Sequence, residues 1–261
     1  MPCRTDPRWL ERARRDITFT TDLRGRPLSF RTTWGLFSPR EIDEGTRLLL
    51  DHLEIRPDDR AFDLGCGYGP LGLAIAREAP GGHCLMVDKD FVAVEYARRN
   101  AELNGIGNVE VMLSDGFRHV GERRFDLVVS NLPAKTTKEH YYLFFHEACE
   151  RLAPGGRFYV VVISGLRQFV ARAFEEVFGN HEKVKQGRSY TVAVARREPE
   201  GPPRGPIAGR PRAVLKNPPH GPIRLSPVVR LQAAAPGPPR GPSRCRPPPR
   251  TPPSWHAWRC R

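Results

Sequence analysis

The chain of 261 residues has little of several features that mark common protein classes. Its six cysteines are scattered, with no CxxC pair and no Cys/His spacing typical of zinc, so we expect reduced thiols and no metal site. No apolar run is long enough to cross a bilayer, and the N-terminus is charged where a secretory signal is apolar. We therefore expect a cytoplasmic protein that has no membrane partner.

Acidic residues are missing from residues 201–261, which hold 12 Lys and Arg and 17 of the 27 prolines. The first 200 residues carry 30 basic and 29 acidic groups, so the net charge of +13 belongs to this final segment. Proline cannot continue a helix or a central strand, and few large apolar groups offset the entropy of ordering. Residues 198–261 are therefore predicted to be a disordered basic tail, either an arm that attracts RNA or a chance extension.

Apolar strands alternate with helices from residue 60 onward. The predicted strands are 61–65, 83–88, 109–113, 125–131, 157–163, 181–187 and 190–197, and the predicted helices are about 70–79, 90–104, 138–152 and 166–178. This alternation predicts a mainly parallel sheet covered on both faces. The turn between the last two strands is too short for a parallel crossover, so one of them must run antiparallel. The fold class is α/β, with a Rossmann-like sheet of seven strands that ends in an antiparallel hairpin.

The segment before this alternation predicts a hairpin and one helix. Two β-rich runs within 17–37 flank a turn at 24–27. Ser38 suits a helix N-cap, with Pro39 at the first helical position and Glu41 closing a capping box. The apolar face of this helix is predicted to be Ile42, Thr46, Leu49, Leu50 and Leu53.

A glycine-rich loop, DLGCGYGPLG at 63–72, follows the first long strand. Glycines let a backbone turn tightly and approach a ligand, and the next helix points its N-terminal amides at the same crevice. Asp88 ends the next strand, where a carboxylate accepts both ribose hydroxyls of a nucleoside cofactor. The glycine spacing also fits a dinucleotide fingerprint, so NAD remains an alternative.

Two other acids and one asparagine motif bear on that choice. Asp63 precedes the loop and Asp115 follows the third strand, although a core-edge acid and a simple turn residue explain them equally well. The motif Asn131-Leu132-Pro133-Ala134 ends the strand 125–131, and hydride transfer has no evident need for it there. We interpret this motif as favouring a methyl donor over NAD.

These stretches together resemble the small-domain family of class I S-adenosylmethionine-dependent methyltransferases, which includes bacterial rRNA guanine-N2 methyltransferases and compact archaeal-type members. The matching stretches are GLFSPREIDEGTRLLL, DLGCGYGPLG, SDGF, FDLVVSNLPA and VFGNHEKVKQGRSYTVAVARR. Within them, Gly35-x-Phe37-Ser38 with Asp43-x-Gly45-Thr46 is more specific than the glycine loop. The resemblance covers 17–197 and divides the chain into a segment 1–16, a hairpin and helix 17–58, and a Rossmann-like core 59–197.

The resemblance implies S-adenosylmethionine as the cofactor. In such enzymes the acid at Asp63 helps hold the methionine end, often through water, and Asp115 lies where the adenine amino group is met. The residues implied to bind the cofactor are Phe37, Thr46, Asp63, Gly65, Cys66, Gly67, Gly69, Asp88, Lys89, Ser114, Asp115 and Asn131.

Catalysis is assigned by the same resemblance to Asn131, Leu132 and Pro133. The side-chain oxygen of Asn131 and a main-chain carbonyl, that of Leu132, are implied to accept the N–H bonds of the target amine. The alternative is that Asn131 caps the following turn. The motif departs from the family's Asn-Pro-Pro-aromatic form, because Leu132 replaces the first proline and Ala134 replaces the aromatic.

Loss of that aromatic removes the usual stacking platform at Ala134, a predicted substrate contact. Phe37 or Trp34 is a candidate replacement, and packing of both rings against the sheet is the alternative. Three hypotheses follow: methylation of RNA, with guanine N2 of rRNA favoured; methylation of a protein glutamine or a small molecule; and cofactor binding without catalysis.

Overall fold

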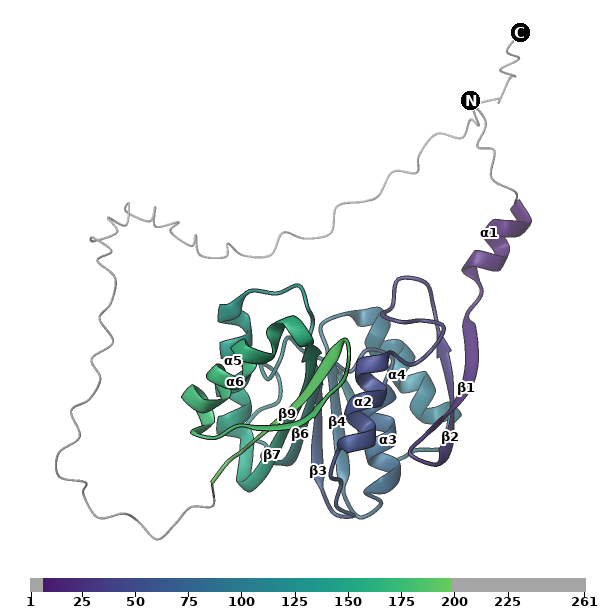
Figure 1. Ribbon diagram of the computed structural model, residues 1–261. Coiled ribbons are helices and arrows are strands. Elements are labelled where there is room, and N and C mark those ends of the chain that lie inside the picture. Colours follow the sequence, from purple (N-terminus) through teal and green to yellow (C-terminus); the bar gives the residue numbers. More distant parts are fainter. Residues whose placement is uncertain (1–6, 199–261) are drawn as a thin grey trace, which may run out of the picture. The chain divides into compact units, whose positions relative to one another are not determined.

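The computed structural model describes residues 7–198 (Figure 1). Its helices are α1 (Pro7–Arg14), α2 (Glu44–His52), α3 (Pro70–Glu78), α4 (Phe91–Leu103), α5 (Lys138–Arg151), the 3-10 turn η1 (Ser164–Leu166) and α6 (Arg167–Phe178). Its strands are β1 (Ile17–Leu23), β2 (Arg26–Thr32), β3 (Arg60–Leu64), β4 (His83–Asp88), β5 (Val109–Leu113), β6 (Phe125–Asn131), β7 (Leu152–Ile163), β8 (Glu182–Gln186) and β9 (Tyr190–Arg196). Apart from residue 198, the predicted tail lies outside the described residues.

Seven strands form the central sheet in the order β5-β4-β3-β6-β7-β9-β8. The pairs β3–β4, β4–β5, β3–β6 and β6–β7 are parallel, whereas β9 runs antiparallel to both β7 and β8. The prediction of a mainly parallel Rossmann-like sheet that ends in an antiparallel hairpin is confirmed. The chain leaves β3 toward one edge of the sheet and returns at β6 to build the other, so a crevice opens between these strands at their carboxyl ends.

Alternate residues of each strand enter two separate cores. Phe62 and Leu85 belong to the core under α5 and α6, whereas their neighbours Ala61 and Cys84 belong to the core under α2, α3 and α4. The near-continuous apolar runs of β3, β4 and β6 follow from this burial on both faces. The two cores hold the carboxyl ends of the strands rigidly beneath the crevice.

The hairpin β1–β2 forms as expected, with a two-residue turn at Arg24 and Gly25, both at positive φ (57° and 76°). The predicted start of the following helix was wrong. Ser38 is left-handed (φ 46°) and its hydroxyl donates to the Glu41 carbonyl, so it does not cap a helix. The helix α2 starts at Glu44, five residues after the predicted start at Pro39, and its N-cap is Asp43, whose side chain accepts a bond from the Thr46 amide.

The remaining boundaries agree closely, except that β7 begins at Leu152, five residues before the prediction. Leu152 pairs with Phe125 across an irregularity in the register, which extends the strand backward. None of the helices described is both long and apolar enough to cross a membrane.

Candidate active site

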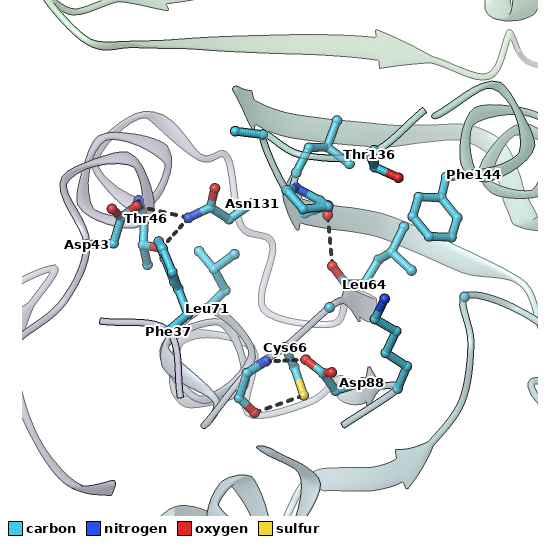
Figure 2. Close-up of a pocket in the computed structure, with 18 of the residues that line it drawn as sticks. Phe37, Asp43, Thr46, Leu64, Cys66, Leu71, Asp88, Asn131, Thr136 and Phe144 are labelled. Carbon is cyan, nitrogen blue, oxygen red and sulfur yellow. Dashed lines mark hydrogen bonds between the residues drawn. The ribbon is translucent and has the colours of Figure 1, made fainter. Parts of the chain in front are cut away.

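A cavity of about 430 Å³ opens at the carboxyl ends of β3 and β6. Figure 2 shows its wall, with Asn131 and Thr46 on one side, Asp88 and Cys66 below, and Phe144 on the far side. The cavity is lined by the segment before α2, the start of α2, the glycine loop and the ends of β4, β6 and β7. The turn after β5, the loop after β6, α5 and the start of β9 complete the lining. Segments far apart in the chain therefore converge on one site.

The glycine loop has two kinds of glycine. Gly65 and Gly67 adopt positive φ (76° and 56°), line the cavity, and have open space where a side chain would stand. A Cβ at Gly69 or Gly72 would instead lie 2.8 or 2.5 Å from atoms of Met86. The first pair therefore leaves room for a ligand, whereas the second pair permits close packing of the loop on its core.

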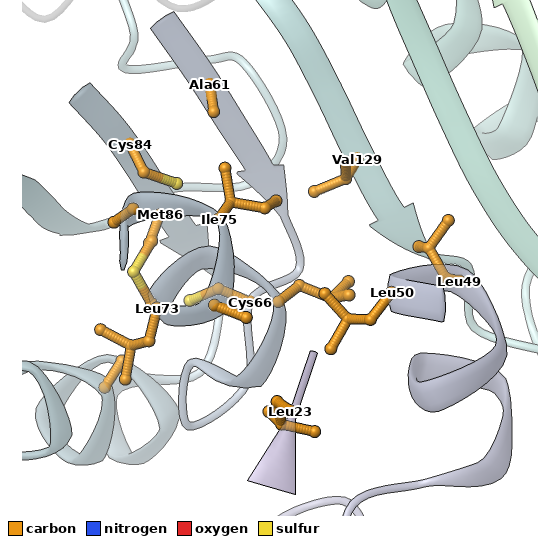
Figure 3. Packing of buried hydrophobic residues seen from close by; sticks show 14 of the residues in the cluster. Leu23, Leu49, Leu50, Ala61, Cys66, Leu73, Ile75, Cys84, Met86 and Val129 are labelled. Atoms are coloured by element: carbon orange, nitrogen blue, oxygen red, sulfur yellow. The ribbon is translucent and has the colours of Figure 1, made fainter. Parts of the chain in front are cut away.

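Figure 3 shows that core, in which Cys66, Leu73 and Met86 come together from the loop, α3 and β4. Cys66 is buried, and burial raises the pKa of its thiol well above the ordinary value. The thiol therefore stays protonated and is no nucleophile. Its place in the cavity wall is that of a small apolar group.

Asp88 lies at the end of β4 and accepts one backbone bond on each oxygen, from Gly67 N (2.9 Å) and Asp90 N (2.9 Å). Each carboxylate oxygen has two acceptor positions, so one on each remains for a diol. Lys89, Ser114 and Asp115 also line this part of the cavity. The Ser114 hydroxyl donates to Gly116 O (2.8 Å), which holds the turn after β5.

Asp63 lies beneath the loop and is fully buried. Its Oδ2 accepts a bond from Gly72 N (2.8 Å), but its Oδ1 has no partner among the described residues. Burial raises the pKa of this carboxyl to about 7, opposed by the Gly72 bond and assisted by nearby Asp88. The predicted cofactor residue thus stands behind the cavity wall, with one oxygen unsatisfied.

The asparagine motif forms the opposite wall. The Asn131 side-chain nitrogen donates to Asp43 Oδ2 (3.0 Å) and to Thr46 Oγ1 (3.0 Å), and its oxygen points away from both (Figure 2). Leu132 N donates to Val161 O (3.1 Å), and the Tyr141 hydroxyl donates to Pro133 O. The motif is therefore anchored to β7 and α5, and Asn131 does not serve as a cap of its own turn.

Aromatic rings at the cavity come from the segment before α2 and from α5. Phe37 lines the cavity and is 66% exposed, so the alternative that it packs against the sheet is wrong. Trp34 is also exposed and carries the Arg40 guanidinium 4.6 Å from its ring centre, outside the cavity lining. Ala134 lines the cavity without a ring, as its sequence dictates.

The structure brings together most of the predicted residues. Those in the cavity wall are Phe37, Thr46, Gly65, Cys66, Gly67, Asp88, Lys89, Ser114, Asp115, Asn131, Leu132, Pro133 and Ala134. Three predicted contacts, Asp63, Gly69 and Trp34, are not in the wall. Asp63 is buried beneath the loop, Gly69 is the part of the loop that packs on the core, and Trp34 is exposed outside the cavity lining.

Sequence reasoning missed Asp43, Tyr190, His140 and Phe144, which also line the cavity. The motif Asp43-x-Gly45-Thr46 is a sequence signal for Asp43, but the sequence does not show that Asp43 bonds to Asn131 on β6. Phe144 and His140 are one helical turn apart on α5, with ring centres 4.2 Å apart, and no motif in the sequence marks either as a cavity residue. Within residues 7–198, no three His, Cys, Asp or Glu side chains gather as metal ligands.

Comparison with known proteins gives one family model, the methyltransferase small domain, which matches residues 27–194. An uncharacterized Bacillus subtilis protein, YbxB, is 32% identical over 185 residues, which are 69% of this chain and 91% of that protein. A ribosomal RNA large subunit methyltransferase G of Streptomyces avermitilis is 33% identical over 66% of this chain and 46% of its own length.

A solved structure with similar architecture is a T. thermophilus 16S rRNA N2 methyltransferase in complex with AdoMet and guanosine. It superposes with a TM-score of 0.64 at 28% identity, over 70% of this chain and 51% of that one. The chain thus spans about half the length of the rRNA methyltransferases that it matches.

Proposed function

The chain belongs to the methyltransferase small domain family, and from this premise we propose that it transfers a methyl group from S-adenosylmethionine to guanine N2 of ribosomal RNA. The observation that carries the proposal is the Asn131 side chain, held in the cavity wall opposite the glycine loop with its oxygen free. Support for the acceptor comes from relatives that are rRNA methyltransferases. An rRNA substrate also supports a cytoplasmic location.

The residues present fit the cofactor. Gly65 and Gly67 leave open space at the loop, and Asp88 retains one acceptor position on each oxygen for the ribose hydroxyls. The unpartnered Oδ1 of buried Asp63 can accept a hydrogen bond from a water molecule that also contacts the methionine end of the cofactor. The family membership decides against the alternative of NAD.

The bound cofactor supplies an electrophilic methyl group on a sulfonium. Because such a donor has a good leaving group, the chain needs no strong base, and its task is to strip water from the amine and aim the nitrogen lone pair. The Asn131 oxygen and the Leu132 carbonyl accept the amine N–H bonds, which fixes the direction of that lone pair. Phe37 offers an exposed face on which the base stacks in place of the ring missing at Ala134.

The proposal is tested with purified full-length protein, labelled S-adenosylmethionine and unmodified 16S and 23S rRNA transcripts. Asn131→Ala should reduce kcat by about 100-fold, in the range for removing a group that aligns or stabilises the reacting atoms. Asn131 is also an expected cofactor contact, but the S-adenosylmethionine Kd of the variant should change less than kcat, because the glycine loop and Asp88 are intact. Asn180→Ala is the matched control, since the half-buried Asn180 side chain donates to the Phe178 and Arg196 carbonyls and accepts from the Arg196 amide, outside the cavity lining.

The cellular test is mass spectrometry of rRNA nucleosides with and without the gene, and loss of N2-methylguanosine is expected. Unchanged nucleosides together with labelling of a ribosomal protein or release factor would replace RNA by a protein glutamine as the acceptor. Tight binding of S-adenosylmethionine without transfer to any fraction of a cell extract would indicate a non-catalytic binding module.

A further inference from the structure

The orientation of the Asn131 amide is determined by its neighbours. Its nitrogen donates both protons, one to Asp43 Oδ2 and one to Thr46 Oγ1, each at 3.0 Å. A carboxylate only accepts hydrogen bonds, so turning the amide over would set its oxygen against the oxygen of Asp43. The group that Asn131 presents to the cavity is therefore its carbonyl oxygen, an acceptor.

Asp43 is itself held in place from two further directions. Its Oδ2 accepts a bond from Thr46 N (3.1 Å) at the start of α2, and its Oδ1 accepts one from the Tyr190 hydroxyl (3.1 Å) at the start of β9. Burial and the nearby Asp43 carboxylate raise the pKa of Tyr190, so the phenol remains a donor. Residues of α2, β6 and β9 thus meet at one carboxylate. Thr46 is close to Asp43 in the sequence, whereas Asn131 and Tyr190 are 88 and 147 residues away.

Gly45 makes this meeting possible. A Cβ at this position would lie 2.8 Å from Tyr190 Cδ1 and 2.9 Å from Asp43 Oδ2. Any larger residue would push the Tyr190 ring away or displace the carboxylate. The spacing Asp43-x-Gly45-Thr46 is therefore accounted for residue by residue, since Asp43 and Thr46 bond to Asn131 and Gly45 leaves room for Tyr190.

We propose that Asp43, Thr46 and Tyr190 form an amide clamp that holds Asn131 with its oxygen toward the substrate, and so selects a reacting atom that carries protons to donate, such as an amine nitrogen. This inference rests on the proposed function, because it assigns to the same site its selectivity for an amine. The three clamp residues are positioning residues that act through Asn131. A ring nitrogen that carries no hydrogen is rejected, because it has no proton to donate and its lone pair would face the Asn131 oxygen.

The clamp is tested first without any substrate, by NMR of the Asn131 side-chain amide in the full-length protein, assigned by its loss in Asn131→Ala. The clamp predicts two separate proton signals that exchange slowly with water. Thr46→Val, which keeps the side-chain shape, should shift one signal and speed its exchange at least tenfold, and Tyr190→Phe should shift both. Signals unchanged in both variants would overturn the clamp.

The kinetic test uses Thr46→Val with rRNA transcripts and labelled S-adenosylmethionine. We expect kcat to fall about tenfold. Thr46 is also an expected cofactor contact, so the S-adenosylmethionine Kd is measured alongside and should change less than kcat. Thr46→Ser, which keeps the oxygen, should recover most of the rate. Tyr142→Phe is the control, because it removes a tyrosine hydroxyl bonded to a carboxylate, Glu176, outside the cavity lining.

A double-mutant cycle separates positioning from general structural damage. In an Asn131→Ala background, Thr46→Val should lower kcat less than twofold further, because the clamp has nothing left to hold. A full tenfold further loss would overturn the clamp. Protected amide signals in a protein that transfers no methyl group to RNA would contradict the proposed function and leave the clamp standing.

Discussion

Asp63 shows how one buried acid couples stability to pH. The carboxyl of the folded chain has a pKa of about 7, whereas that of the unfolded chain has the ordinary value of 3.8. Between these values the folded state binds more protons than the unfolded state, so stability falls as the pH rises. The unfavourable contribution is absent below about pH 4 and fully present above about pH 7.

Asp63→Asn should remove this dependence, because the amide oxygen can still accept the Gly72 bond and no charge forms on burial. Urea unfolding should show that the free energy of unfolding of Asp63→Asn, relative to that of the wild type, is higher at pH 8 than at pH 5 by on the order of a few kcal/mol. Asp58→Asn, at an exposed position before β3, is the control. Parallel stability profiles for wild type and Asp63→Asn would refute the prediction.

Phe37 is expected to bind the base. Base stacking on an aromatic ring contributes about 1–3 kcal/mol, so Phe37→Ala should raise the KM for rRNA at least fivefold in steady-state assays. Phe91→Ala is the matched control, because Phe91 is 65% exposed against 66% for Phe37 and lies outside the cavity wall. A loss of S-adenosylmethionine affinity instead would assign Phe37 to the cofactor.

At the scale of elements, the hairpin is joined to α4 by two asparagines. Asn100 accepts from Arg31 N (2.7 Å) and donates to Arg31 O (3.0 Å), and Asn104 makes the same pair of bonds with Ser29. Asn100 lies on α4 and Asn104 is its C-cap, one turn later. Their side chains bond to the backbone N–H and C=O groups of alternate residues of β2, as a neighbouring strand would. The free edge of β2 is thereby covered, which removes a template for aggregation.

Asn100 also donates to Tyr68 O (2.9 Å), so the same amide connects the hairpin with the glycine loop. Asn100→Ala should lower the free energy of unfolding by about 2–4 kcal/mol, since three backbone groups lose their partner. Hydrogen exchange at the Arg31 amide should become faster. Glu102→Ala, at an exposed position on the same helix, should change neither quantity. An unchanged Arg31 exchange rate in Asn100→Ala would contradict the role of Asn100 as the partner of β2.

At the scale of the whole molecule, the last backbone hydrogen bonds of the sheet are made before the basic segment begins. Arg197 N donates to Gly156 O (2.9 Å) and Gly155 N donates to Arg197 O (2.9 Å), one residue beyond β9. Deletion of residues 199–261 should therefore leave the melting temperature and the S-adenosylmethionine Kd unchanged. Calorimetry of the full-length and shortened chains measures both, and a drop in melting temperature would show that the segment contributes to the fold.

The same deletion tests the segment as an RNA-attracting arm. It removes 12 Lys and Arg and a single acid, Glu200, so RNA affinity should fall and its dependence on salt should become shallower. An unchanged salt slope would favour the chance extension. The domain limits of 17 and 197 remain a prediction until such truncations are made.

Local patterns in the sequence predicted the fold well, because they report nearest-neighbour physics. The apolar runs of β3, β4 and β6 record burial on both faces, and the short turn before β9 forces an antiparallel strand. The one misplaced helix start has the same origin. Ser38, Pro39 and Glu41 satisfy the local rules for a cap, but Asp43 caps α2, and its carboxylate is also held by Tyr190 on β9.

The sequence by itself determined the sheet, the glycine loop and the family, and it placed Asn131 and Asp88 at strand ends where a cofactor would meet them. Only the tertiary structure decided which way the Asn131 amide faces, that Asp63 is buried behind the cavity wall, and that Phe37 lines the cavity with its ring exposed. The reason is physical: a hydrogen bond between residues 88 or 147 positions apart depends on how the elements pack, and no local propensity encodes that distance.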